Sequence, residues 1–268
     1  MKPTDRRGAL RAGAAAAVAG ALATACGTEP RPAPTPAAAR RPAPTSTPAA
    51  VRRPAPAPAV APAPRRFPGL PDEIAHGPRD RPRVALTFHG QGDPALARTL
   101  LGQAEKAGAR VTVLAVGSWL DDHPALARRV LDGGHDLGNH TQRHLDINAM
   151  TEAEAHAEIE ACAARLRRLT GSVGSWFRPS RTRHAAPAVL RAAHRAGYPH
   201  VLSYDVDSLD FTAPDAATVV RDVTGAVRAG SVVSLHFGHP VTAAALPLLL
   251  ADLDRRGLRA VTTTELLT

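Results

Sequence analysis

The chain has 268 residues and a formal net charge of +9 at neutral pH, and this length suits one or two domains. The excess positive charge lies in the first 66 residues, because residues 67–268 hold 22 basic and 22 acidic side chains. This neutral balance removes the electrostatic support for a nucleic-acid partner. Only one of the two cysteines, Cys162, lies beyond residue 66, which excludes an intramolecular disulfide there.

Residues 1–26 have the features of an export signal. A basic start with paired arginines at positions 6 and 7 precedes a mildly apolar stretch at residues 12–25, which is shorter than the roughly 20 residues that span a bilayer. The paired arginines resemble a twin-arginine signal, which exports folded proteins. The sequence ATAC resembles a lipoprotein cleavage box with Cys26 as the lipidated residue. We expect an exported protein, either anchored to the cell membrane through Cys26 or secreted to the cell wall.

Residues 27–66 are rich in Pro, Ala and Arg and have no periodic apolar positions. Such a sequence favours extended polyproline conformations and has no apolar face to bury. We expect a disordered tether whose arginines favour anionic lipid or wall polymer. The catalytic domain is then expected at residues 67–268.

From residue 83 onward, strand-like and helix-like segments alternate. Apolar runs predict strands at residues 83–88, 110–116, 135–138, 176–179, 200–206, 231–237 and 258–263. The patterns between them predict helices at residues 94–107, 118–132, 151–169, 185–196, 214–228 and 240–256. Alternation of this kind builds parallel βα units, so we expect an α/β fold, a distorted parallel (β/α) barrel of about seven strands. An open doubly wound sheet is the alternative, although no G-x-G-x-x-G motif follows the first strand.

Polar side chains gather where the predicted strands end. The stretch ALTFHGQGDPALA at residues 85–97 passes from a buried strand through a Gly-rich turn into a helix. An α/β enzyme presents its chemistry at the carboxyl end of a strand in this way. In a barrel such positions converge on one mouth, and here they hold His89, Asp93, His140, His144, Arg178, Asp205, Asp207, Asp210 and His236.

The segment GNHTQRH places His140 and His144 four residues apart. On one helical turn, residues at this spacing face the same way, so both imidazoles can reach one metal ion. A lone pair of histidines at this spacing is more often structural. The metal-binding interpretation therefore depends on the other motifs of the chain.

Five motifs stand in the order and spacing of the NodB-homology polysaccharide deacetylases, carbohydrate esterase family four. They are ALTF with a polar turn, GNHTQRH, WFRP, DVDSLDF and VVSLHF, and the resemblance covers about residues 83–266. It implies a hydrolase that removes acetyl groups from sugars with the help of a divalent metal, usually zinc. In that family an Asp and the two histidines of H-[ST]-x-x-H hold the metal. A second Asp is the base, and a later His protonates the leaving amine.

The resemblance carries over to this chain residue by residue. His140 and His144 match the metal-binding histidines. Arg178 matches the Arg that orients the catalytic base. His236 matches the catalytic His, and Asp210 matches the Asp that steers it.

Three further positions match residues around the substrate. Arg181 takes the place whose backbone N–H helps to form the oxyanion hole. Phe211 stands where the family has the Trp of an Asp-Trp pair. Ser234 replaces an apolar residue that lines the acetyl pocket, so the resemblance implies a more polar pocket here.

The first motif departs from the family. The family has T-F-D-D-G, with the first Asp as base and the second as metal ligand, whereas this chain has His89 and Gly90 at these places. In one interpretation His89 is the base, kept neutral by the nearby charge of Arg178, and Asp93 folds back as the third ligand. In another, His89 is the third ligand and Asp93 is the base. In the last, the site is degenerate and the domain only binds glycan.

We therefore expect a metal-dependent hydrolase, with Zn²⁺ as its cofactor, that removes acetyl groups from N-acetylated or O-acetylated polysaccharide of the cell envelope or the environment. A catalytically silent glycan-binding domain tethered to the envelope is the alternative. A different metal-dependent hydrolase on a similar barrel is a third. The expected partners are a polysaccharide or oligosaccharide and, through Cys26, the membrane. We expect a monomer.

Overall fold

The computed structural model describes residues 62–268. The expected export signal, Cys26 and most of the expected tether lie outside the described residues, so the expectations for them stay predictions. Within residues 62–268, no helix combines the length and the apolar character that a membrane span requires.

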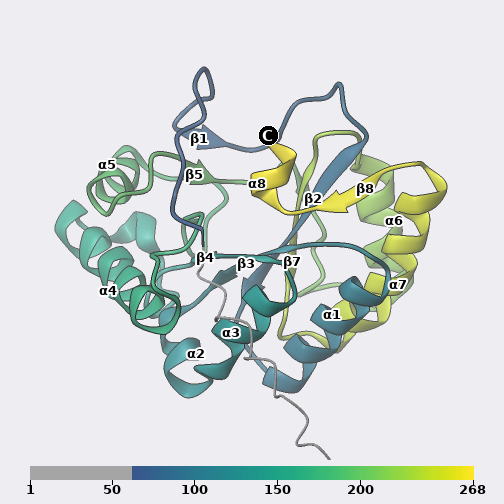
Figure 1. Ribbon diagram of the computed structural model, residues 1–268, viewed down its shortest axis with the longest axis horizontal. Helices are drawn as coiled ribbons and strands as arrows, with labels where there is room; N and C mark the ends of the chain where they lie inside the picture. Colours follow the sequence, from purple (N-terminus) through teal and green to yellow (C-terminus); the bar gives the residue numbers. More distant parts are fainter. Residues whose placement is uncertain (1–61) are drawn as a thin grey trace, which may run out of the picture. The chain divides into compact units, whose positions relative to one another are not determined.

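Parallel strands form the centre of the described residues (Figure 1). The main sheet has the order β4-β3-β2-β7-β6, and β8 pairs with the first residues of β2. β1 and β5 form a separate parallel pair, which single bridges through Phe177 connect to the end of β4. The result is the distorted parallel barrel that the alternation of elements predicted. Its strands are β1 (Glu73–Ile74), β2 (Arg83–Gly90), β3 (Thr112–Ala115), β4 (Asp136–Asn139), β5 (Val201–Leu202), β6 (Val206–Asp207), β7 (Val232–His236) and β8 (Arg259–Val261).

Helices connect the strands and cover the sheet. In Figure 1, α4 and α5 lie together on one side, and α1, α6 and α7 lie on the other. The helices are α1 (Pro94–Lys106), α2 (Gly117–Asp122), α3 (Ala125–Asp132), α4 (Glu152–Thr170), α5 (Pro187–Arg195), α6 (Ala216–Ala226), α7 (Pro240–Arg255) and α8 (Thr263–Leu266), with a 3-10 turn, η1, at Ile147–Ala149.

The helix α4 illustrates how local sequence sets the ends of an element. Thr151 and Glu154 each accept a hydrogen bond from the other's backbone N–H, which satisfies two free donors at the start of the helix. Gly171 ends the helix with a φ of 81°, a conformation that glycine adopts without strain. The apolar face of α4 is buried and includes Cys162, whose pKa burial raises to about 12, as a structural thiol requires.

Three expected elements differ from the structure. The helix expected at residues 118–132 is two helices, because Pro124 disfavours helical backbone at His123 and separates α2 from α3. The strand expected at residues 200–206 is divided into β5 and β6. Between them, Asp205 forms an ion pair with Arg79 at 2.8 Å and accepts the N–H of Val232, the first residue of β7, at 2.7 Å. Asp205 therefore does not lie at the mouth, where the sequence placed it. The strand expected at residues 176–179 is reduced to single bridges.

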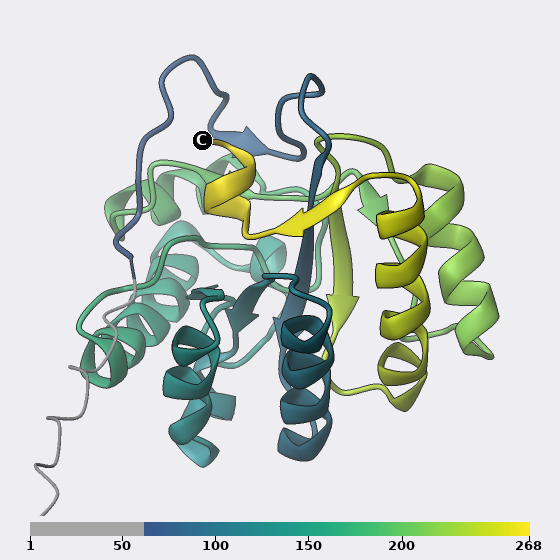
Figure 2. The ribbon, with the colours of Figure 1, turned by 45° about the vertical axis from the view of Figure 1, so that its right-hand side comes forward.

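The pairing of β2 with β7 positions the polar residues at the strand ends. Figure 2 shows the two strands running in the same direction, away from α8. Their register aligns Thr87 with Ser234 and His89 with His236. Because side chains two residues apart on a strand point to the same face, these four residues share one face of the sheet. His89 and His236 therefore meet where both strands end.

Candidate functional site

A loop after β4 brings His140 and His144 together. Residues 140–146 are not helical, so the two histidines do not meet through a helical turn. Thr141 and His144 have φ angles of 68° and 55°, and the N–H of His144 donates to Thr141 Oγ1 at 3.2 Å. The tight turn places the centroids of the two imidazole rings 4.9 Å apart. Left-handed backbone at two non-glycine residues is strained, and such strain is concentrated at functional sites.

His140 is fully buried and held in one tautomer. Its Nδ1 lies 3.0 Å from the carbonyl oxygen of Arg178, which can only accept, so Nδ1 carries the proton. Its Nε2 is buried and has no hydrogen-bond partner among the described residues. Buried polar atoms without a partner are rare in native proteins. The free lone pair of Nε2 is therefore available to an electrophile.

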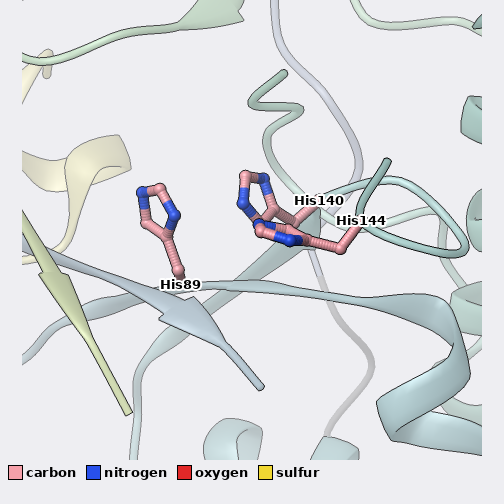
Figure 3. Close-up of side chains that lie close together, drawn as sticks. All are labelled: His89, His140 and His144. Atoms are coloured by element: carbon pink, nitrogen blue, oxygen red, sulfur yellow. The ribbon is translucent and has the colours of Figure 1, made fainter. Parts of the chain in front are cut away.

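His89 completes a cluster of three imidazoles. It is only 8% exposed, and its ring centroid lies 4.4 Å from that of His140. One ring nitrogen of each of His89, His140 and His144 lies within 4.8 Å of the others. Figure 3 shows one nitrogen of His89 facing the other two rings across the gap between them. The Nε2 atom of His89 lies 3.2 Å from Ser234 Oγ.

The three imidazoles are neutral at physiological pH. Burial lowers the pKa of His89 and of His140 well below 6.5, and charge on neighbouring histidines and Arg178 lowers both further. Burial also lowers the pKa of His144, to about 4, with added effects from Arg181 and His236. Neutral imidazole is the form that binds metals.

The structure places Asp93 at a helix cap and not at this cluster. Its exposed carboxylate accepts the N–H of Ala95 at 2.7 Å and caps α1, whose first residue is Pro94. Asp93 is also absent from the residues that line the pocket described below. The geometry therefore favours His89 over Asp93 as the third member of a metal site.

Gly90 has no room for a side chain. A Cβ added at this position would lie 2.9 Å from Val113 Cγ1 and 3.0 Å from Ala115 Cα, both on the neighbouring strand β3. Gly90 pairs with Ala115 in the register of these strands. The close approach of β3 thus excludes a carboxylate from the position where the related family carries one.

His236 and Asp210 form a hydrogen-bonded pair beside the three-histidine cluster. His236 Nδ1 donates to Asp210 Oδ1 at 2.6 Å, and Asp210 Oδ2 accepts the N–H of His236 at 2.8 Å and the hydroxyl of Thr242 at 2.6 Å. Burial raises the pKa of Asp210, but the hydrogen bonds from His236 and Thr242 outweigh it and leave this pKa below its ordinary value. The carboxylate is therefore ionised and fixes the tautomer of His236, whose ring centroid lies 4.4 Å from that of His89.

Arg178 is buried behind the histidines and connects β5 to β2 through hydrogen bonds. Its fully buried guanidinium donates to the carbonyl oxygens of Leu202 and Ser203, each at 3.0 Å, and to Thr87 Oγ1 at 2.8 Å. Burial lowers its pKa to about 10, so it stays charged at neutral pH. The resemblance implies an Arg that orients the base, whereas these acceptors are all neutral groups of the barrel.

The cluster and the His–Asp pair open onto one pocket of about 310 Å³. Phe211 is 48% exposed at its edge, with its ring centroid 5.1 Å from that of His236. Arg181, at a φ of 57°, and Ser234 also line it. The structure therefore brings together all of the expected site residues except Asp93, with Arg178 beneath. The lining residues are His89, His144, Arg181, Thr182, Arg183, Tyr204, Asp207, Phe211, Ser234 and His236.

Sequence reasoning assigned no role to two residues that belong to this site. Asp207 is the carboxylate among the described residues that line the pocket, and it pairs with Ser234 in the register of β6 and β7. Its position at the end of a short apolar run predicts a place at the mouth of the barrel. Asp205, two residues earlier, has the same kind of position, so the sequence does not distinguish the two. Thr242 bonds to Asp210 from the first turn of α7, a contact between distant segments that no local pattern reveals.

The three-histidine cluster fits a divalent metal. His140 presents a buried nitrogen that lacks any other partner among the described residues. The other two residues offer neutral nitrogens within 4.8 Å of it and of each other. Three imidazoles with one position left open are a donor set that zinc accepts in catalytic sites.

Comparisons with known proteins agree with the motifs. Residues 76–201 match the family model of polysaccharide deacetylases. A peptidoglycan-N-acetylglucosamine deacetylase of Bacillus cereus is 30% identical over 202 residues, which are 71% of this chain and 90% of that protein. A chitooligosaccharide deacetylase of a Bradyrhizobium species is 28% identical over 65% of this chain and 85% of its own length. A CE4 family pseudoenzyme from Bacillus anthracis, 22% identical over 74% of this chain and 70% of its own, shares the fold with a TM-score of 0.69.

Proposed function

Because the chain belongs to the polysaccharide deacetylase family, hydrolases that act on N-acetyl amide bonds, we propose that it is a metal-dependent deacetylase of cell-envelope glycan. The related proteins deacetylate peptidoglycan N-acetylglucosamine and chitooligosaccharide, so a polymer that contains N-acetylglucosamine is the proposed substrate. The observation that carries this proposal is the three-histidine cluster beside the His236–Asp210 pair in one pocket.

We infer that His89, His140 and His144 hold the metal and that the ion is Zn²⁺. The support is a set of three neutral nitrogens, one of them buried without a hydrogen-bond partner among the described residues. When bound, zinc polarises an acetyl carbonyl and acidifies a water molecule. His140 donates its Nδ1 proton to the carbonyl oxygen of Arg178, an arrangement that orients a metal-binding imidazole.

The His236–Asp210 pair supplies the acid. Asp210 accepts the Nδ1 proton of His236, which leaves Nε2 of His236 to exchange a proton with the substrate. In the proposed reaction, His236 protonates the nitrogen of the sugar amine as the bond to the acetyl carbon breaks. Asp210 stabilises the imidazolium that precedes this step, as the carboxylate of a hydrolytic triad does.

With His89 as a ligand, another group of the pocket takes the proton of the attacking water. Among the described residues that line the pocket, Asp207 is the carboxylate and His236 is the imidazole that is not a proposed ligand. We propose that one of them is the base. For the sugar, the exposed face of Phe211 offers an apolar platform, and the backbone N–H of Arg181 is proposed to bind the oxygen of the acetyl group.

The silent glycan-binding domain stays as the second candidate, because both acidic positions of the first motif are lost in this chain. A Bacillus anthracis protein that shares this fold is described as a pseudoenzyme, so the fold also occurs without the activity. The intact His236–Asp210 pair favours the enzyme, since a silent domain has no need of a buried carboxylate that orients a histidine.

The test combines metal analysis of the purified protein with acetate release from N-acetylglucosamine oligomers. We expect one divalent metal per chain, and acetate release that a chelator abolishes and Zn²⁺ restores. Finding neither metal nor acetate would favour the glycan-binding alternative. Metal without acetate release would favour a hydrolase of another substrate on the same barrel.

We also propose that the protein acts outside the cytoplasmic membrane, anchored through lipid on Cys26. The support is the sequence of residues 1–26 and the names of the envelope-acting relatives. We expect mature protein that begins at Cys26 in the membrane fraction, and Cys26→Ser protein in the medium or wall fraction. Membrane attachment that survives Cys26→Ser would exclude lipidation, and full-length protein in the cytoplasm with residues 1–26 intact would exclude export.

A further inference from the structure

Two residues at which this chain departs from its family are in contact. His89 replaces an Asp and Ser234 replaces an apolar residue, and the two are 145 positions apart in sequence. The register of β2 and β7 places them on one face of the sheet. There Ser234 Oγ lies 3.2 Å from His89 Nε2. The hydroxyl of Ser234 thus contacts the imidazole that stands in place of the carboxylate at position 89.

The direction of this hydrogen bond depends on the tautomer of His89. A serine hydroxyl can donate to a ring nitrogen or accept from it. Figure 3 shows that the nitrogen on the other side of the His89 ring, Nδ1, faces His140 and His144. A nitrogen that faces a metal must be unprotonated, so Nε2 must then carry the proton and donate it to Ser234 Oγ.

Ser234 therefore contacts His89 in the same way as the carbonyl oxygen of Arg178 contacts His140. With Nε2 of His89 protonated, an oxygen accepts the proton of one ring nitrogen in both pairs, and the other ring nitrogen faces the cluster. The two histidines use opposite nitrogens, Nδ1 in His89 and Nε2 in His140. Ser234 is 1% exposed and His89 is 8% exposed, so the contact between them lies at the buried wall of the pocket.

We propose that Ser234 is a positioning residue that accepts a hydrogen bond from His89 Nε2 and presents Nδ1 of His89 to the metal. This inference rests on the proposed function for its metal, but the hydrogen bond itself does not need one. The role expected for Ser234 was to line the acetyl pocket. The role proposed here is to accept a hydrogen bond from a residue that binds the metal.

The first measurement is made on the metal-free protein. Long-range ¹H–¹⁵N spectra report the tautomer of each histidine, and His89→Asn identifies the signals of His89 by their loss. We expect Nε2–H with a proton that exchanges slowly with water in the wild type and in Ser234→Thr. In Ser234→Ala that proton should exchange too fast to be seen. A His89 that carries its proton on Nδ1, or a signal unchanged in Ser234→Ala, overturns the inference.

The second measurement is the affinity for Zn²⁺, by competition with a chromophoric chelator. Loss of a hydrogen-bond partner of a ligand weakens metal binding by about 10- to 100-fold, and we expect this loss in Ser234→Ala with rescue by Ser234→Thr. Ser231→Ala is the matched control, because Ser231 is a buried serine just before β7 whose hydroxyl contacts Asp205 instead. Equal affinity in Ser234→Ala and Ser231→Ala contradicts the proposal.

The two measurements separate this inference from the proposed function. If the wild type binds no Zn²⁺, the metal-dependent function fails, and the spectra still decide the His89–Ser234 hydrogen bond. If the wild type binds Zn²⁺ and the hydrogen bond is absent, the function stands and the role of Ser234 is wrong. Thermal unfolding of each variant confirms that the protein compared is folded.

Discussion

We expect the replacement of His140 or His144 by alanine to abolish stoichiometric binding of a divalent metal and, with it, acetate release. His140 offers a buried nitrogen that has no other partner among the described residues, and His144 offers a neutral one beside it. Metal content by elemental analysis checks this result. His156→Ala, on α4 and outside the cluster, is the control and is expected to keep its metal. Metal content unchanged in both ligand variants would show that the cluster is structural.

The same measurement on His89→Ala and Asp93→Ala decides between the two assignments of the first motif. Since His89 faces the other two histidines and Asp93 caps α1, we expect His89→Ala to lose metal and Asp93→Ala to keep it. Asp93→Ala should lower the free energy of unfolding by about 1 kcal/mol, because only the N-cap hydrogen bond of α1 is lost. The reverse result, with metal retained in His89→Ala and lost in Asp93→Ala, would make His89 the base and Asp93 the ligand.

The second large effect is expected at the His–Asp pair. His236→Ala should lower kcat by about 10²–10⁴-fold while the protein keeps its metal, because the variant lacks the proposed acid for the leaving amine. Asp210→Asn should also lower kcat, since the amide does not stabilise imidazolium and does not fix the same tautomer. Steady-state kinetics with metal content as the control checks both. A His236→Ala enzyme with full kcat would remove His236 from the mechanism, and Asp207→Asn then tests the other acceptor.

The Asp210 carboxylate also makes stability depend on pH. Its pKa in the folded protein lies below the ordinary value, because hydrogen bonds from His236 and Thr242 favour the charged form. The group therefore stabilises the fold above the ordinary pKa of about 3.9, and this contribution is lost as the pH falls through the folded pKa. Denaturant unfolding at pH 6 and pH 3 should show a smaller difference for Asp210→Asn than for the wild type. An equal difference would contradict the lowered pKa.

Much of the fold could be predicted because its signals are local. The apolar run before residue 89 and the capping residues of α4 set their elements through neighbours in sequence. The break between α2 and α3 was also local, at Pro124, and could have been foreseen. The division of β5 from β6 could not, because it depends on Asp205 reaching Arg79 and the start of β7.

The site was predictable to the extent that its residues follow strands. Positions after strands identified His89, His140 and His236, since parallel strands end at one mouth. The capping role of Asp93 could have been foreseen, because an Asp directly before a Pro at the first helical position is a helix-start signal. The contact between His89 and Ser234 depends on the register of two strands far apart in the chain, which no motif contains.

The tight packing around Gly90 makes it difficult to introduce a pair of aspartates at positions 89 and 90. Aspartate can be restored at position 89 by a single substitution, because a side chain already occupies that space. At position 90 the same repair would push against Val113 and the backbone of β3 at Ala115. A protein engineer who wants a two-carboxylate centre in this chain must therefore move β3 first. For changes to the groups around this site, residues 89 and 234 are therefore more accessible positions than residue 90.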